Sequence, residues 1–233
     1  MSELLKISDL RGGYKEGVDI LRGIDLSVQE GEAVGIIGLN GSGKSTLGKA
    51  IMNMIPIRRG QIIFDGEDVT ALSTHELSRK GLSIMQQGGQ VFPTLSVWEN
   101  LELAMTSASS LNEIRDIIPL LQRPKRELQH KMADKLSGGQ KHQLALAMTL
   151  ATNPKLVILD EPSAGLSPKA VEEMYTVLLS IRKFRNISVI LIEQKIARAI
   201  SYCNFNYMVT RGVNHILKGT DIEDLQSSVF KNL

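Results

Sequence analysis

The chain of 233 residues contains a single cysteine, Cys203. One cysteine excludes an intrachain disulfide and any metal site built from a cysteine cluster, and it is typical of a reducing compartment. We interpret Cys203 as a small packed residue. An excess of one charge is also lacking, because 27 Lys and Arg residues face 25 Asp and Glu residues, for a net charge of +2. No basic tract is dense enough to indicate nucleic-acid binding, so we expect no DNA or RNA partner.

Long hydrophobic runs are absent as well. The first ten residues, MSELLKISDL, show no apolar core after a basic start, and no stretch approaches the length of a membrane span. Any work at a membrane would therefore be done through partners. Hydrophobic residues make up 42% of the chain and charged residues 22%, which is typical of a globular protein with a substantial core. The length allows one large domain or a domain with an inserted lobe.

A glycine-rich segment, GLNGSGKST, follows the apolar run EAVGIIG and fits the phosphate-binding pattern G-x-x-x-x-G-K-[ST]. A buried strand that ends in these glycines lets backbone N–H groups surround one concavity at a helix start, where an anion fits. Lys44 can reach the β- and γ-phosphates of a nucleotide, and the Ser45 hydroxyl can hold Mg²⁺. A glycine-rich turn without a ligand would not explain why Lys and Ser follow the last glycine. The residues expected to bind the nucleotide are Gly38, Asn40, Gly41, Ser42, Gly43, Lys44, Ser45 and Thr46.

The order of strand and helix patterns predicts an α/β fold. Apolar and polar residues alternate from Leu4 to Val28, which indicates half-buried antiparallel strands joined by a turn at Gly12 and Gly13. Helical periodicity follows the phosphate loop in KSTLGKAIMNMI, RRGQIIFDGEDV predicts a strand and turn, and HELSRKGLSIMQQ predicts a helix leading to a strand. Strand patterns return at KLVILDEP, ISVILIEQ, NYMVTRG and NHILKG, with a helix at PKAVEEMYTVLLSIRKF. This alternation favours a mainly parallel sheet with helices on both faces.

The middle of the chain, from Gly88 to Leu150, has a different character and is mainly helical. PTLSVWENLELAM and LNEIRDIIPLLQ are typical of amphipathic helices, and RPKRELQHK, rich in proline and charge, is interpreted as a joint. We interpret residues 88–150 as an inserted helical lobe. Residues 1–87 and 151–233 then form a nucleotide-binding core, and the whole chain, residues 1–233, is one domain.

Two carboxylates follow a predicted buried strand in LVILDEP. Asp160 and Glu161 fall at the carboxyl end of that strand, the edge where ligands bind in open α/β sheets. Asp160 can hold the Mg²⁺ shared with Ser45, and Glu161 can polarise the attacking water as general base. The same Asp–Glu pair could also be a helix cap or a pair of surface residues after a core strand. The pair becomes strong evidence only in combination with the phosphate loop.

A second glycine-rich helix start lies in KLSGGQKHQLALAMTLA. Ser137 and Gln140 satisfy the capping-box pattern S-x-x-Q, which by itself explains the serine and the glutamine. It does not explain Gly138 and Gly139, which are costly at a helix start unless the backbone must approach something closely. Since a helix N-terminus favours a phosphate, the chain has two glycine-rich helix starts suited to phosphate.

Together, GLNGSGKST, LSGGQ and LVILDEP resemble the ATP-binding subunits of ABC transporters, over nearly the whole chain. The resemblance implies a P-loop NTPase core with an inserted helical lobe, ATP and Mg²⁺ as cofactors, and ATP hydrolysis. It also implies that two subunits meet head to tail and sandwich two ATPs. Each ATP would lie between one chain's phosphate loop and the LSGGQ segment, or signature, of the other chain. The signature residues Ser137, Gly138, Gly139 and Gln140 would therefore act in trans.

Other residues take roles from the same resemblance. Tyr14 matches the aromatic residue that stacks on adenine, although a turn aromatic packed on the core is an equal alternative. Gln87 matches the glutamine that contacts Mg²⁺ or the water, and the adjacent Gln86 could take its place. The segment QVFPTLSVWENL resembles the part that lines the groove for a membrane subunit. Its apolar residues could equally belong to the core; they are Val91, Phe92 and Trp98.

Two positions depart from the general family pattern. Gln194 stands where most members have a switch histidine, and a glutamine can donate a hydrogen bond but cannot carry charge. Ser167 stands where an aspartate is common. Both departures, with the pair Glu193 and Gln194, resemble one ATPase subunit of branched-chain amino-acid or urea importers, whose partner ATPase usually has the histidine.

The partners implied by the resemblance are membrane-spanning permease subunits and a second ATPase subunit, with a heterodimer favoured over a homodimer. The chain would be a peripheral protein at the cytoplasmic face of the cell membrane. A soluble ABC-type ATPase is the alternative, and a weakly catalytic, nucleotide-gated regulatory subunit is another. No residue of the sequence identifies the transported solute.

Overall fold

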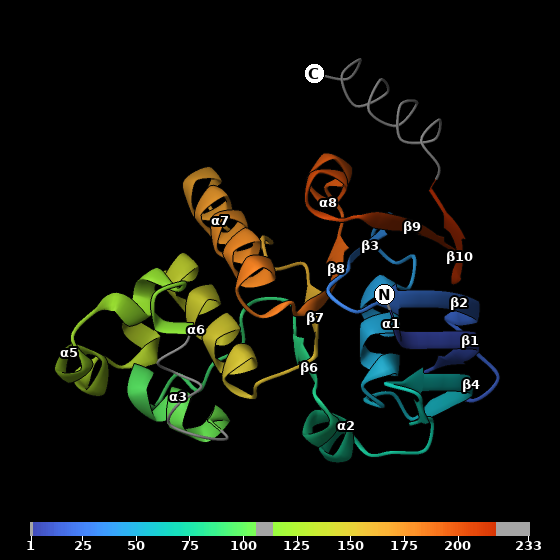
Figure 1. Ribbon diagram of the computed structural model, residues 1–233, viewed down its shortest axis with the longest axis horizontal. Helices are drawn as coiled ribbons and strands as arrows, with labels where there is room; N and C mark the ends of the chain where they lie inside the picture. Colours follow the sequence, from blue (N-terminus) through green and yellow to red (C-terminus); the bar gives the residue numbers. More distant parts are fainter. Residues whose placement is uncertain (1, 106–113, 218–233) are drawn as a thin grey trace. The chain divides into compact units, whose positions relative to one another are not determined.

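A computed structural model describes residues 2–105 and 114–217 (Figure 1). The chain divides into two compact units by its backbone contacts. Unit 1 comprises the residues up to Leu77 together with those from Ser188 onward, and unit 2 runs from Ser78 to Ile187. The helical lobe predicted for residues 88–150 falls within the range of unit 2, and its exact boundaries stay a prediction. No helix in the described ranges is both long and apolar enough to cross a membrane.

Unit 1 begins with the predicted antiparallel sheet, whose strand order is β2-β1-β4-β5. The predicted turn at Gly12 and Gly13 is wrong, because both glycines lie inside β1, where Gly12 pairs with Leu21. A Cβ on Gly13 would lie 2.4 Å from the carbonyl oxygen of Val18, so the returning chain passes too close to the strand for a side chain. The strands are β1 (Glu3–Gly13), β2 (Leu21–Gln29), β4 (Ile57–Phe64) and β5 (Glu67–Asp68).

The second sheet segment of unit 1 has the order β10-β9-β3-β8. Strand β3 is parallel to both β8 and β9, and all five of its residues are buried, as its apolar run predicts. Helix α8 packs against β3 and β8; the sequence pattern does not predict it, because its seven residues are too few for a clear helical period. The elements are β3 (Ala33–Ile37), α1 (Lys44–Ile51), α2 (Thr74–Lys80, which continues into unit 2), β8 (Ser188–Glu193), α8 (Ile196–Tyr202), β9 (Phe205–Thr210) and β10 (Val213–Ile216).

Unit 2 joins two parallel strands to a set of helices, with α6 packed against α3, α7 and β6. Capping boxes begin both α3 and α6, and the second of these confirms the box predicted at Ser137 and Gln140. The elements are β6 (Leu82–Met85), α3 (Val97–Ala104), η1 (Pro119–Gln122), α5 (Lys125–His130), η2 (Ala133–Lys135), α6 (Gly138–Ala151), β7 (Leu156–Asp160) and α7 (Pro168–Arg185).

Two predictions inside the lobe are wrong. LNEIRDIIPLLQ is not one helix: Ile114 and Arg115 are helical, a turn follows, and a 3₁₀ helix begins at Pro119. Proline has no N–H and disfavours helix at the residue before it, so the helix cannot run through this point. Residues 111–113, the first part of the same prediction, lie outside the described residues. The supposed joint RPKRELQHK contains helix α5, which starts directly after Pro124 and buries Leu128.

Candidate functional site

The phosphate loop lies between β3 and α1, as predicted. A Cβ on Gly38 would lie 2.4 Å from the carbonyl oxygen of Val209 and 2.8 Å from Ser42 Oγ, so no larger residue fits. Gly43 caps α1 in the left-handed region with φ of 108°, and no side chain caps the helix. The first N–H groups of an α-helix have no partner inside the helix. The N-terminus of α1 is thus a place where a bound anion is stabilised.

The polar side chains of the loop fit a bound phosphate. Lys44 is only 4% exposed, and its Nζ donates a hydrogen bond of 3.0 Å to the carbonyl oxygen of Leu39. Ser42 Oγ is buried and has no hydrogen-bond partner among the described residues. A buried hydroxyl in this state calls for an explanation, and a bound anion supplies one. Asn40 and Gly41 are exposed at the rim, and Ser45 and Thr46 lie in the first turn of α1.

Gln194 reaches the same edge of the sheet as the phosphate loop. In the parallel pair of β3 and β8, Ile37 is opposite Glu193, so Gly38 and Gln194 both follow at the carboxyl ends of neighbouring strands. Glu193 is 2% exposed, and its Oε2 accepts a hydrogen bond of 3.2 Å from the backbone N–H of Gln194. Tyr14 is 46% exposed, which does not match an aromatic residue packed in the core. Its ring is available for stacking.

The two predicted carboxylates lie in unit 2. Asp160 ends β7 and is 2% exposed, and Glu161 follows with φ of 47°, a conformation that is uncommon for a residue with a side chain. Gln87 Nε2 donates a hydrogen bond of 2.9 Å to Glu161 Oε2. Gln87 rather than Gln86 thus contacts the candidate base.

The oxygen donors suit Mg²⁺. In residues 2–105 and 114–217, no three His, Cys, Asp or Glu side chains gather as metal ligands. Mg²⁺ is usually held by one or two carboxylates together with the phosphates of a nucleotide and water, so it needs no such cluster. The carboxylate of Asp160 and the hydroxyl of Ser45 are hard oxygen ligands of the required kind.

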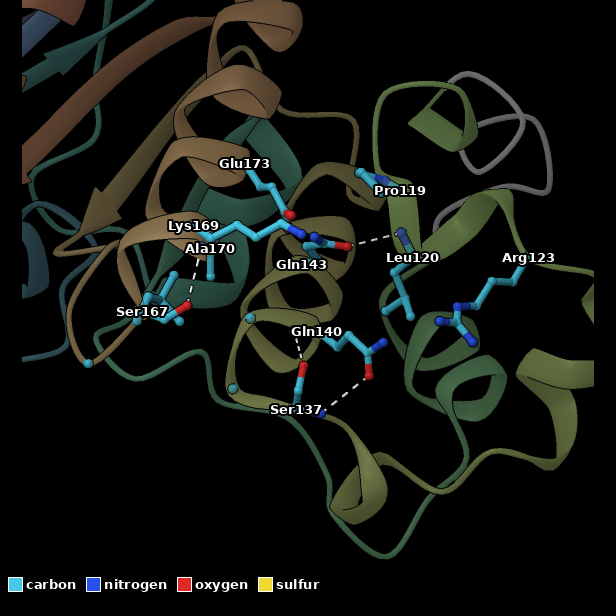
Figure 2. Close-up of a pocket in the computed structure, with 14 residues that line it drawn as sticks. Pro119, Leu120, Arg123, Ser137, Gln140, Gln143, Ser167, Lys169, Ala170 and Glu173 are labelled. Atoms are coloured by element: carbon cyan, nitrogen blue, oxygen red, sulfur yellow. Dashed lines mark hydrogen bonds between the residues drawn. The ribbon is translucent and has the colours of Figure 1, made fainter.

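The signature, residues 136–140, contributes Ser137, Gly138, Gly139 and Gln140 to the lining of a cavity of about 510 Å³ in unit 2 (Figure 2). Ser137 Oγ accepts from the Gln140 N–H at 3.3 Å, and Gln140 Oε1 accepts from the Ser137 N–H at 3.2 Å. A Cβ on Gly138 would meet only Leu166, at an ordinary distance of 4.0 Å, whereas one on Gly139 would lie 3.2 Å from Ala170 Cβ. Nothing in the described part of unit 2 therefore requires residue 138 to be glycine.

Several residues that line this cavity are not singled out by the sequence analysis; they are Pro119, Leu120, Arg123, Gln143, Lys169 and Glu173. Gln143 could have been found, because it lies three residues after Gln140 on the same face of α6. The residues from η1 and α7 carry no local signal, since only the packing of three segments brings them to the signature. Ser167 also lines the cavity, and its Oγ caps α7 by accepting from the Ala170 N–H at 3.4 Å.

The three apolar residues that could line a groove or belong to the core are not fully buried. Phe92 is 52% exposed, although its backbone is fixed, since its N–H donates to Asn100 Oδ1 at 2.8 Å. Trp98 is partly buried, and the ammonium of Lys125 lies 4.1 Å from the centre of its ring. Val91 is also partly buried.

Comparison with known proteins agrees with this arrangement. The family described as ABC transporter matches residues 21–164. A probable branched-chain amino acid transport ATP-binding protein, LivF, of Archaeoglobus fulgidus is 33% identical over 99% of this chain and 98% of its own. The lipopolysaccharide export system ATP-binding protein LptB of Escherichia coli is 30% identical over 98% of this chain and 95% of its own. A dimeric ATP-binding cassette in a post-hydrolysis state with ADP and Pi is 25% identical, with a TM-score of 0.77, over 93% of this chain and 100% of its own.

The match to the family covers more than half of the chain, and the relatives align along almost all of it. The prediction of an ABC ATP-binding subunit with a P-loop NTPase fold is thereby confirmed. The chain belongs to the ABC transporter family and is an ATP-binding subunit that hydrolyses ATP.

Proposed function

We propose that the chain is the motor of a membrane transporter in which two cassettes enclose ATP between them. ATP binding closes the pair, hydrolysis and phosphate release open it, and permease subunits convert this cycle into solute passage. The subunit would lie at the cytoplasmic face of the membrane without entering it. A known cassette with related structure is dimeric in the state bound to ADP and Pi, which supports the pairing.

The observation that carries this proposal is the absence, among the described residues, of an internal reason for Gly138. The space around a Cβ at Gly138 is open, and both Gly138 and the preceding Ser137 are exposed. A glycine that the fold does not need is explained if a ligand from outside the chain approaches its backbone closely. That ligand would be the nucleotide held by the phosphate loop of the second cassette.

Within the chain's own half of each site, we assign roles by chemistry. Lys44 and the open N-terminus of α1 bind the phosphates, with the ring of Tyr14 against the adenine. Ser45 and Asp160 are the proposed ligands of Mg²⁺, Gln87 is a proposed further contact, and the ion would neutralise charge on the phosphates when bound. Glu161 takes a proton from water, and its contact with Gln87 Nε2 orients the carboxylate.

The solute we propose is a branched-chain amino acid or a similar small polar molecule, taken up by an importer with two unlike ATPases. The 33% identity to a LivF protein supports the solute class, and Gln194 supports the pairing of unequal cassettes. Export is a second candidate, because the lipopolysaccharide exporter subunit LptB is nearly as similar over nearly as much of the chain. Isolation of the intact complex from membranes, with identification of its subunits and of the solute that stimulates ATP hydrolysis, decides between them.

Two variants test the motor itself. Lys44→Ala is expected to lower ATP turnover by about 10²- to 10³-fold, because it removes preorganised charge at the phosphates. Glu161→Gln is expected to keep ATP binding and to lower turnover by about 10²- to 10⁴-fold, the range for loss of a general base. Lys49→Ala, a lysine on the same helix as Lys44, is the matched control. Near-normal turnover in the first two variants would overturn the proposed roles.

A further inference from the structure

The cavity beside the signature extends well beyond Gly138 and Gly139. Its volume of about 510 Å³ lies in the range of sites for whole small molecules, roughly 300–1,000 Å³. The part away from Gly138 and Gly139 is bounded by side chains of η1, α6 and α7 (Figure 2). Those side chains decide what else the cavity can hold.

Gln143 presents an amide donor to this cavity. It is 7% exposed, and its Oε1 accepts a hydrogen bond of 3.0 Å from the backbone N–H of Leu120, which fixes the direction of the amide. The Nε2 atom has no hydrogen-bond partner among the residues that the structure describes. Because the amide is fixed in this direction, Nε2 can donate to an acceptor that enters the cavity.

Lys169 adds a positive charge on the same wall. It lies in the first turn of α7, and Figure 2 shows its side chain turned toward the Gln143 amide. Lys169 forms no ion pair with any described residue, whereas Arg123, the other cation of the lining, is paired with Glu127. Glu173 is the one carboxylate among the lining residues. An unpaired cation, a free amide donor and a helix N-terminus together favour an anion.

We propose that Lys169 and Gln143 bind phosphate oxygens of the nucleotide that the second cassette brings to the signature. The assignment rests on the proposed function, in which that nucleotide acts across the pair. On the signature side Ser167 is a neutral N-cap, so Lys169 supplies a charge that Ser167 lacks. Lys169 thus provides charge to the nucleotide from the signature side.

The test uses the isolated complex with its second ATPase, and it measures turnover against ATP concentration. Lys169→Met keeps the length of the side chain without its charge and is expected to raise KM for ATP by about tenfold or more, the typical loss for a hydrogen bond to a charged group. Lys169→Arg should restore most of the affinity. Gln143→Glu keeps the acceptor for Leu120 but faces the phosphate with a carboxylate, and should also raise KM. Glu173→Gln removes a repelling charge and should lower it.

Controls separate this inference from the proposed function. Lys141→Met makes the same charge change in the first turn of α6 but outside the cavity, and should leave KM unchanged. ATP binding to the isolated chain, through its own phosphate loop, should be normal in Lys169→Met and lost in Lys44→Ala.

A wild-type KM in Lys169→Met overturns the inference alone. A weaker complex of Lys169→Met in the absence of nucleotide would assign Lys169 to an acidic side chain of the partner and also overturn it. A wild-type complex that neither binds nor hydrolyses ATP would overturn the proposed function.

Discussion

The two glycine-rich helix starts of this chain use glycine for opposite reasons. At α1, in unit 1, a Cβ added to Gly38 would lie only 2.4 Å from the carbonyl oxygen of Val209. The backbone at Gly43 is left-handed, which favours glycine there. At α6, in unit 2, Gly138 has open space around it and ordinary dihedral angles. The first start is buried and uncapped, and the second is exposed and closed by its own capping box.

The difference shows where the demand for glycine comes from. The chain's own backbone demands it in the phosphate loop, which must curl tightly beside β9 before α1 begins. At Gly138 the described chain makes no such demand, since the helix would form as well with alanine, a better helix former. The glycines of the loop can thus be understood from unit 1 alone, whereas Gly138 is explained by the ligand that we propose.

The largest effect is expected for Gly38→Ala. The added methyl group would overlap backbone and Ser42 Oγ, and overpacking of this kind costs typically about 1–3 kcal/mol of unfolding free energy. We expect the variant to lose ATP binding as well, because the loop must shift. Thermal unfolding and nucleotide titration measure the two effects. Gly66→Ala, at a positive-φ glycine with free space in the same unit, should lose some stability and keep ATP binding.

Gly138→Ala should show the opposite pattern. Its free energy of unfolding should stay equal or rise by up to about 1 kcal/mol, since alanine is the better helix former. Turnover should fall by about 10²-fold, as for the loss of one donor, because the added methyl group would keep a phosphate away from the backbone N–H groups. Normal turnover in this variant would mean that nothing approaches the signature backbone, and the comparison between the two helix starts would fail.

The sequence predicted the parts of the site that depend on local pattern. The strand β3 with its loop, Asp160 at the end of β7, and the box of Ser137 and Gln140 are each set by neighbours in the chain. The turn at Gly12 and Gly13 was wrong because the close approach of the returning chain at Val18, and not a bend at the glycines, explains Gly13. Lys169 was missed for a similar reason, since the meeting of three segments gives it its surroundings.

The capping boxes offer a smaller and cleaner test. Ser137→Ala and Ser96→Ala each remove the hydroxyl of a box, and each should cost about 1 kcal/mol of unfolding free energy. Only Ser137 lies in the signature cavity, so only its loss should also reduce turnover. Unfolding by urea and steady-state ATP hydrolysis on the same preparations separate the two contributions. Equal loss of turnover in both variants would show that the Ser137 effect is a general one of helix stability.

The smallest expected effect is on the pH dependence of stability. The two capping boxes should differ in it because they have different residues at the third helical position. In the α3 box this residue is Glu99, whose pKa is held below its ordinary value of 4.5 chiefly by the backbone N–H of Ser96 and also by the Ser96 side chain. Because the folded pKa is depressed, the stabilisation is present above the unfolded value and is lost as pH falls through the folded one. The α6 box has Gln140, which does not titrate. We therefore expect Glu99→Gln to flatten the stability profile slightly below pH 4.5, measured by melting temperature between neutral and acidic pH. Gln140→Glu should add an acid dependence to the signature helix, and a flat profile in that variant would show that its box opens when the glutamate is introduced.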